Sequence, residues 1–389
     1  MRFSGFAAFA GAALLVTTAF AQDVVKIGQI EAQTGPNSVN GWMSSQGVPM
    51  AVDEINKAGG FQVAGKKYKL ELISLDTRGD PKEATVQIKR LIERDKVKFV
   101  FGPFLSNVFA TILPYAEQFN GKFLLMGGAT RAHEYLGKPG YEFVVRTWSW
   151  DTGPQGFGEL MTDYVKKLGT KKIAMLMQND QGGQVVASIY EDLFKKAGIE
   201  TKLEFFEPGT KDFSAALAKL AAWKPDLLFP GYNDSVMYDI MRQSTEGNYF
   251  RRFMVARGSM GPCLKNKAEI DDCIVYVPKY FEEAEKTNDK VKKFVAAYKA
   301  FYKRDFPYDQ APICSQSCYD HVYMLVAAMQ KAGTVDDVTA IRKALLSITY
   351  EGLWKISFDE KGEQIFDFDV VHMKRNGEIK VTTIDPPRK

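Results

Sequence analysis

Short runs of apolar residues alternate with amphipathic segments over most of the chain. Near-continuous apolar runs of this length are typical of buried strands, whereas apolar residues recurring every three to four positions indicate helices. Strands separated by helices in this way predict parallel sheets that are covered by helices on both faces. The pattern occurs in two batches, before and after about residue 150, so we expect two doubly wound α/β lobes. The predicted strands are 24–30, 69–76, 98–104, 123–127, 143–148, 172–178, 226–232 and 253–257, and the predicted helices are 46–57, 81–94, 154–168, 185–197, 213–223 and 235–245.

The alternation stops after about residue 280. Three successive helices are predicted at 290–303, 312–332 and 335–347, followed by strands at 354–359 and 366–374. Three helices in a row cannot form a third α/β domain, so we expect them to return and cover an existing lobe. Several crossings then join the lobes, and a ligand cleft is expected between them at the carboxyl ends of the strands. The predicted first lobe comprises 22–149 plus 279–360, and the second comprises 150–278 plus 361–389.

The N-terminal residues have the pattern of an export signal. Arg2 precedes a nearly pure apolar stretch from Phe6 to Phe20, and Ala19-Phe20-Ala21 supplies a small-x-small cleavage pattern. The stretch is shorter than the roughly 20 apolar residues that span a bilayer. We therefore expect a signal peptide over residues 1–21, cleavage after Ala21, and a soluble mature protein in the periplasm.

The overall composition excludes several classes of protein. Among 389 residues, 46% are hydrophobic and 25% are charged, which is ordinary for a folded protein and unlike a disordered, collagenous or coiled-coil chain. Lys and Arg number 51 against 47 Asp and Glu, a net charge of +4. The two signs are spread along the chain, without the basic patch that marks a nucleic-acid binder. Nucleic acid is therefore not an expected partner.

The four cysteines allow three pairings. Cys263 and Cys273 are ten residues apart, and an oxidising compartment favours a local disulfide between them. Cys314 and Cys318 are four residues apart and would share one face of a helix, a strained geometry for a disulfide. Buried thiols are therefore the alternative for that second pair.

Motifs of the common enzyme classes are absent from the sequence. It contains no GxSxG elbow, Walker A loop, HExxH or strand-linked GxGxxG; the nearest approach is Gly258-Ser259-Met260-Gly261, which has Arg257 in place of the first glycine. We expect no enzymatic activity, no metal and no cofactor, with an exported hydrolase kept as the alternative from another class. The three histidines lack the spacing of metal ligands and lie at His133, His321 and His372.

A series of short motifs in fixed order resembles the solute-binding proteins of ABC importers in the branched-chain amino acid (Leu/Ile/Val-binding) class, which have the type I periplasmic binding protein fold. The resemblance covers essentially the whole mature chain. The motifs are Ile27-Gly28, Thr34-Gly35-Pro36, the segment 51–60 ending in Gly59-Gly60, Asp76, Pro81 with Ala84, Phe101-Gly102 with Ser106, Gly127-Gly128-Ala129-Thr130, Arg146-Thr147, Lys211-Asp212-Phe213-Ser214 and Asp359-Glu360-Lys361-Gly362.

The resemblance implies a mechanism and three ligand contacts. Members of the class close two lobes around a small ligand, then dock on permease subunits in the inner membrane, and they are usually monomers. At matching positions, Ser106 would donate its hydroxyl and N–H to a ligand carboxylate. Gly128 would make backbone contacts, and Thr130 would hold the carboxylate and the ammonium.

Two departures from the family pattern suggest a different ligand. Arg257 follows the strand after which the family has a glutamate that pairs with the ligand ammonium. A cation there would repel an ammonium and bind a carboxylate bidentately. The family's second-lobe tyrosine is also replaced, because Asp180-Gln181-Gly182-Gly183 occupies that stretch; Asp180, Gln181, Tyr232 and Asn233 are then candidate contacts.

We therefore predict a small carboxylate ligand, an aromatic or branched organic acid. Trp42 would offer it an apolar face, since this tryptophan lies in a Gly/Asn/Ser-rich stretch where a core residue is unusual. The alternative is a receptor for branched-chain or other amino acids. It requires another acid to meet the ammonium, and Asp180 and Asp234 are candidates.

Overall fold

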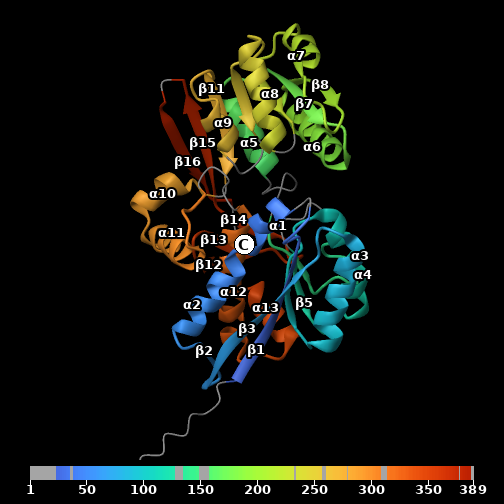
Figure 1. Cartoon of the computed structure of the whole chain (residues 1–389), viewed down its shortest axis with the longest axis vertical. Coiled ribbons are helices and arrows are strands. Elements are labelled where there is room, and N and C mark those ends of the chain that lie inside the picture. Colours follow the sequence, from blue (N-terminus) through green and yellow to red (C-terminus); the bar gives the residue numbers. More distant parts are fainter. Residues whose placement is uncertain are drawn as a thin grey trace, which may run out of the picture.

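The computed structural model shows two α/β lobes stacked along the long axis of the molecule (Figure 1). It describes residues 23–35, 38–127, 135–148, 157–231, 234–255, 260–277, 279–307, 313–375 and 377–386. The predicted signal peptide, residues 1–21, lies outside the described residues. The two doubly wound lobes predicted from the hydrophobic pattern are confirmed.

The first lobe is built on a six-stranded sheet in the order β2-β3-β1-β4-β5-β6. All neighbouring strands are parallel except β2, which pairs antiparallel with β3. Helices α3 and α4 pack on one face through a separate apolar cluster, and α2 packs on the other. The strands are β1 (Asp23–Glu31), β2 (Phe61–Val63), β3 (Lys66–Asp76), β4 (Phe99–Phe101), β5 (Leu124–Gly127) and β6 (Val144–Arg146). The helices are α1 (Ser38–Ser45), α2 (Gly47–Lys57), α3 (Pro81–Lys89), continued by the π-helical turn η1 (Arg90–Arg94), and α4 (Ser106–Gln118).

The second lobe has a seven-stranded sheet in the order β16-β15-β11-β10-β9-β7-β8. Strands β7 to β11 are parallel, and the β15–β16 hairpin extends the sheet antiparallel. The strands are β7 (Lys172–Gln178), β8 (Glu200–Phe206), β9 (Leu227–Pro230), β10 (Arg252–Val255), β11 (Asp272–Val277), β15 (Phe368–Lys374) and β16 (Ile379–Ile384). The helices are α5 (Phe157–Lys167), α6 (Gln181–Ala197), α7 (Ser214–Ala221), α8 (Asp234–Glu246) and α9 (Gly261–Lys265).

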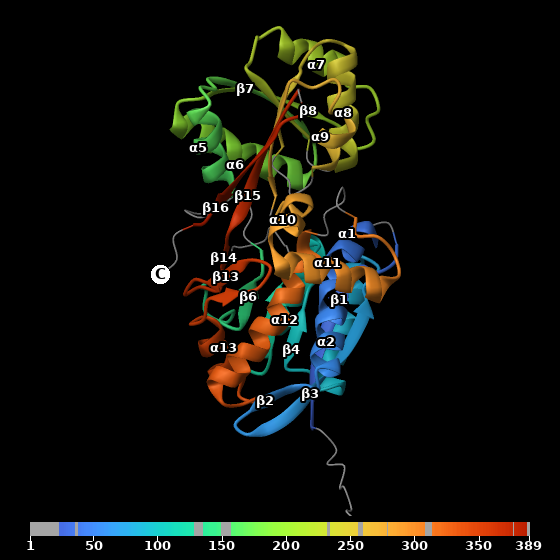
Figure 2. The same cartoon turned by 90° about the vertical axis from the view of Figure 1, so that its left-hand side faces the viewer.

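The C-terminal helices lie beside the first lobe. Helix α12 packs against α2 and α13 (Figure 2). Strands β12, β13 and β14 form a third, three-stranded sheet. Because β14 pairs with β13, residues 364–366 belong to this sheet, although residues 361–389 were predicted for the second lobe. The elements are α10 (Phe281–Thr287), α11 (Asp289–Tyr302), α12 (Ile313–Ala332), α13 (Val338–Leu345), β12 (Tyr350–Glu351), β13 (Lys355–Phe358) and β14 (Gln364–Phe366).

Aromatic side chains from all three interlobe crossings pack together. Phe157 stacks on Tyr276, with ring centroids 4.2 Å apart, and meets Phe368 edge-on at 4.7 Å. Trp148 and Phe366 extend the cluster, with centroids 4.9 Å apart. These rings come from the β6–α5, β11–α10 and β14–β15 connections, so a single apolar cluster joins the crossings of the hinge.

Ion pairs reinforce the same crossings. Arg146, at the end of β6, binds Glu363 in a bidentate pair with Nη2–Oε1 2.6 Å and Nε–Oε2 2.8 Å. Lys279 binds Asp367 at 3.0 Å, and both side chains are largely buried. The Lys279–Asp367 pair therefore joins the β11–α10 and β14–β15 crossings, whereas Arg146 and Glu363 pair where β6 ends and just before β14 begins. No helix among the described residues is long and apolar enough to cross a membrane.

Candidate ligand-binding cleft

The carboxyl ends of the first-lobe strands point toward the second lobe (Figure 1). Ser106 lies there, as the first residue of α4 and half-buried. The residue before it, Leu105, is extended and has no side chain that can cap the helix. The first N–H groups of a helix carry partial positive charge and favour an anion. The start of α4 is therefore suited to a ligand carboxylate, which is the role predicted for Ser106.

The loop that precedes Ser106 rests on a buried carboxyl group. Glu31, the last residue of β1, is 2% exposed, and its Oε2 accepts a hydrogen bond from the N–H of Phe104 at 3.0 Å. Burial raises the pKa of Glu31 to about 8, although hydrogen bonds from Phe104, Ser44 and Ala32 act in the opposite direction. Glu31 is therefore mostly neutral at pH 7. It was not identified from the sequence.

The Thr34 and Asp76 motif positions turn out to hold a neighbouring loop together. The Asp76 carboxylate accepts hydrogen bonds from the N–H of Gln33 at 2.9 Å and of Arg78 at 2.8 Å, and from the Thr34 hydroxyl at 2.5 Å. Desolvation raises the pKa of Asp76, but these hydrogen bonds outweigh it and leave the pKa below its usual value. The loop after β1 is thus tied to the end of β3.

Trp42 lies in α1, half-buried, with one face covered by a cation. The Arg304 guanidinium lies 4.3 Å from the centre of the Trp42 ring, and 5.3 Å and 5.7 Å from those of Tyr302 and Tyr298. Arg304 was missed from the sequence because nothing in the local pattern links residues so far apart. The apolar face predicted for a ligand is therefore already shared with an arginine.

On the second lobe, Asp180 is the N-cap of α6. Its Oδ1 accepts from the N–H of Gly183 at 2.7 Å, and its Oδ2 accepts from the Gln178 amide at 2.6 Å. A Cβ on Gly183 would lie 2.0 Å from the carbonyl oxygen of Gln178, so this helix start requires glycine. Asp180 thus has a structural function besides the ligand contact predicted for it. Gln181 opens α6, and its side chain lies outside the described residues.

The remaining predicted contacts lie outside the described residues and stay predictions; they are Gly128, Thr130, Tyr232, Asn233 and Arg257. Asp234 is the first residue of α8, but its side chain is also not described.

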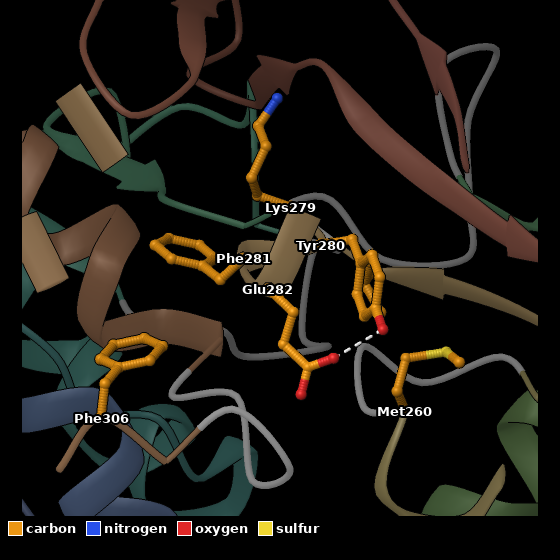
Figure 3. Close-up of a pocket in the computed structure, with 7 residues that line it drawn as sticks. Met260, Lys279, Tyr280, Phe281, Glu282 and Phe306 are labelled. Carbon is orange, nitrogen blue, oxygen red and sulfur yellow. Dashed lines mark hydrogen bonds between the residues drawn. The ribbon is translucent and has the colours of Figure 1, made fainter. Parts of the chain in front are cut away.

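A small hollow lies where residues of both lobes meet the β11–α10 crossing (Figure 3). Met260 follows the β10 region of the second lobe, and Phe306 follows α11. Between them, the Tyr280 hydroxyl donates to Oε2 of Glu282 at 2.7 Å. Burial, followed by the adjacent Glu282 carboxylate, raises the pKa of Tyr280. Glu282 is an acidic group near the interlobe space that was not found from the sequence.

The structure describes one of the two predicted cysteine pairs in full. Cys263, in α9, and Cys273, in β11, form a disulfide with Cα atoms 6.2 Å apart, the pairing favoured from the sequence. The disulfide closes the segment between α9 and β11. Cys318 is buried in α12, and the side chain of Cys314 is not described, so the prediction for that pair stays open. Among the described residues, no cluster of His, Cys, Asp and Glu could hold a metal ion.

The periplasmic binding protein family matches residues 24–378, and the chain belongs to this family. It is 29% identical over 379 residues to the leucine-, isoleucine-, valine-, threonine- and alanine-binding protein of Pseudomonas aeruginosa, covering 95% of this chain and 93% of that protein. The resemblance noted from the sequence motifs is therefore confirmed. On these matches the chain is a solute-binding protein of the ABC-transporter class.

Solved structures share the fold. The leucine binding protein LivK of Thermotoga maritima aligns with a TM-score of 0.73 and 24% identity, over 93% of this chain and 99% of that one. A solute binding protein of an ABC transporter from Rhodopseudomonas palustris, in complex with 3,4-dihydroxy benzoic acid, aligns with a TM-score of 0.70 and 21% identity, over 94% and 99%. Both likenesses concern the two-lobed architecture.

Proposed function

We propose that this protein is a periplasmic receptor of an ABC importer that closes its lobes around a small carboxylate, an aromatic or branched organic acid. The observation that carries the proposal is the start of α4. Ser106 opens this helix at the carboxyl end of β4, on the side of the first lobe that faces the second. The segment from Gly102 to Phe109 contains no acidic residue that would repel an anion.

Two further observations favour an acid without an ammonium group. Arg257 stands in the sequence where the family has its ammonium-binding glutamate. Asp180, one of the replacements considered, already caps α6 with both carboxylate oxygens engaged. The Rhodopseudomonas palustris protein, solved with a dihydroxybenzoic acid, supports the same ligand class on this fold.

The mechanism is hinge closure without catalysis. The ligand bridges the lobes and favours the closed form through contacts that exist only there. The aromatic cluster of the crossings keeps the hinge packed during this motion. The closed receptor then docks, as a monomer, on permease subunits of the inner membrane, whose ATPase partners are other chains.

A receptor for branched-chain amino acids is the second candidate, supported by the Pseudomonas aeruginosa relative. It needs an acid to meet the ammonium. Glu282 is a described candidate, since it lies in α10 just after the β11–α10 crossing, and Asp234 is a candidate from the sequence. The two candidates differ in the ligand and share the fold and the hinge.

A thermal-shift screen of refolded residues 22–389 separates the candidates. The panel contains benzoate, 3,4-dihydroxybenzoate, phenylpropanoids, aliphatic dicarboxylates, leucine and valine. A ligand at 100 times its Kd adds about 2.7 kcal/mol of stability, which gives a clear shift in Tm. We expect shifts with acids that lack an ammonium. A shift with leucine or valine alone would overturn the organic-acid proposal, and turnover of ester or amide analogues would reveal a hydrolase.

Two serine variants test the site. Ser106→Ala removes a hydroxyl that would bind a charged carboxylate, a bond worth about 1.5–3 kcal/mol, so the Kd should rise about tenfold or more. Ser214→Ala is the matched control, because Ser214 also opens a helix, α7, but in the outer part of the second lobe. Equal effects of the two variants would contradict the role of Ser106.

A further inference from the structure

Glu31, at the end of β1, contacts the loop that leads to Ser106. Its carboxyl group accepts a hydrogen bond from the N–H of Phe104, two residues before Ser106. The loop from Gly102 to Leu105 joins β4 to α4, so its position sets the direction of the first N–H groups of that helix. A displaced loop would therefore displace the anion site.

The loop packs directly on the end of β1. Gly102 has φ +86°, and a Cβ there would lie 2.4 Å from the Ile30 carbonyl oxygen and 2.8 Å from Oε1 of Glu31. Helix α1 packs closely on the next residue, since a Cβ on Gly41 would lie 1.9 Å from the carbonyl oxygen of Ala32. Glycine is therefore required at both positions, where the backbone approaches the end of β1.

Burial, and not hydrogen bonding, favours the neutral form of the Glu31 carboxyl group. The N–H of Phe104 donates to its Oε2 at 3.0 Å, and the backbone of Ala32 and the side chain of Ser44 also bond to it. These three bonds favour the ionised form, but the desolvation of a side chain that is 2% exposed outweighs them.

The charges around Glu31 are few. On β3 the residue in register is Asp76, whose carboxylate is occupied by Gln33, Thr34 and Arg78. Helix α1 (SVNGWMSS) and the loop 102–105 (GPFL) contain no charged residue. Among the described residues, no cationic side chain hydrogen-bonds to Glu31, so an ionised Glu31 would present an uncompensated charge close to the start of α4.

We propose that Glu31 is a positioning residue of the cleft: its buried carboxyl group fixes the loop 102–105 and directs the N–H groups of α4 at a ligand carboxylate. This inference rests on the proposed function, because it takes the ligand to be an anion. Ionisation of Glu31 places a negative charge near that anion. The affinity for a carboxylate therefore falls as the pH rises through the pKa of Glu31, which is raised to about 8.

The test combines hydrogen exchange with a pH profile of benzoate binding. Glu31→Ala removes the acceptor, so the Phe104 amide should exchange at least about tenfold faster, whereas Glu31→Gln keeps an acceptor oxygen and should restore slow exchange. By calorimetry, the wild-type Kd for benzoate should be about tenfold higher at pH 9 than at pH 7, because only the protonated form binds well. Glu31→Gln should bind equally at both pH values.

Asp320→Asn is the matched control. Asp320 is a second buried carboxyl group of the first lobe, with a pKa also raised to about 8 by burial, but it lies in α12 and binds the N–H groups of Leu353 and Trp354. This variant should keep the wild-type pH profile. Unchanged Phe104 exchange in Glu31→Ala, or a sloping profile in Glu31→Gln, would overturn the inference. If neither benzoate nor another carboxylate of the panel binds the wild type, the proposed function fails, and the exchange experiment alone decides whether Glu31 holds the loop.

Discussion

The Arg146–Glu363 pair should be one of the strongest single polar contacts of the first lobe. Its guanidinium is 2% exposed and its carboxylate 18%, and the contact is bidentate. The Arg146 N–H also donates to the carbonyl oxygen of Gly362 at 2.8 Å. Removing one partner of a buried pair leaves the other charge desolvated, at a cost of about 3–5 kcal/mol. Because Glu363 keeps some solvent contact, we expect Arg146→Met to lose about 3 kcal/mol of unfolding free energy.

A double-mutant cycle separates this interaction from general damage to the core. Arg146→Met, Glu363→Gln and the double variant are unfolded in urea, with the transition of the first lobe followed. We expect a coupling energy of about 2 kcal/mol, within the range for directly bonded charges. Lys57 and Asp53 provide the control in the same lobe, since their contact is also short, at 2.7 Å, but their side chains are 74% and 33% exposed.

The control pair should couple by only about 0.3–0.5 kcal/mol, because solvent screens it and two flexible side chains must be ordered. The reasoning would be refuted if the two cycles gave the same coupling energy within about 0.5 kcal/mol. Burial would then not distinguish the Arg146–Glu363 pair from an ordinary surface contact.

Three other perturbations follow from buried groups. Burial raises the pKa of both Glu31 and Asp320 to about 8, so between about pH 4 and 8 the folded state binds more protons than the unfolded state. The free energy of unfolding therefore falls as the pH rises, by up to about 1.4 kcal/mol per pH unit for each group. A Glu31→Gln/Asp320→Asn double variant should show a flatter dependence of Tm on pH than the wild type, and parallel curves would contradict this. Gly352→Ala places a Cβ 2.3 Å from Oδ1 of Asp320, and should lower stability by about 2 kcal/mol or more, measured by urea unfolding; a neutral substitution would show that the Asp320 contact can relax. Reducing the Cys263–Cys273 disulfide opens a ten-residue loop, and should lower the unfolding free energy of the second lobe by about 2.7 kcal/mol, because the unfolded chain gains entropy. An unchanged Tm under reductant would contradict this expectation.

The sequence by itself determined the local elements and their layering. Apolar runs such as 172–178 match β7, and Pro81 opens α3 with Asp80 as its cap, because strand burial and helix capping depend on neighbouring residues alone. Strand β8 escaped prediction because it is an edge strand, with charged and half-exposed residues in place of an apolar run. Strand β11 was missed although its six residues are all buried, so the signal was present.

Only the tertiary structure decided which distant residues meet. Arg146 and Glu363 pair although 217 residues separate them, Arg304 lies over Trp42, and Glu31 supports the loop before Ser106. None of these contacts leaves a pattern in the local sequence, because nothing in the residues around one partner points to the other. Their pairing, and the desolvation that raises the pKa of Glu31, arise when sheets and helices pack and exclude water. The order of hydrophobic and polar residues therefore specifies the two lobes, whereas the chemistry of the cleft depends on long-range packing.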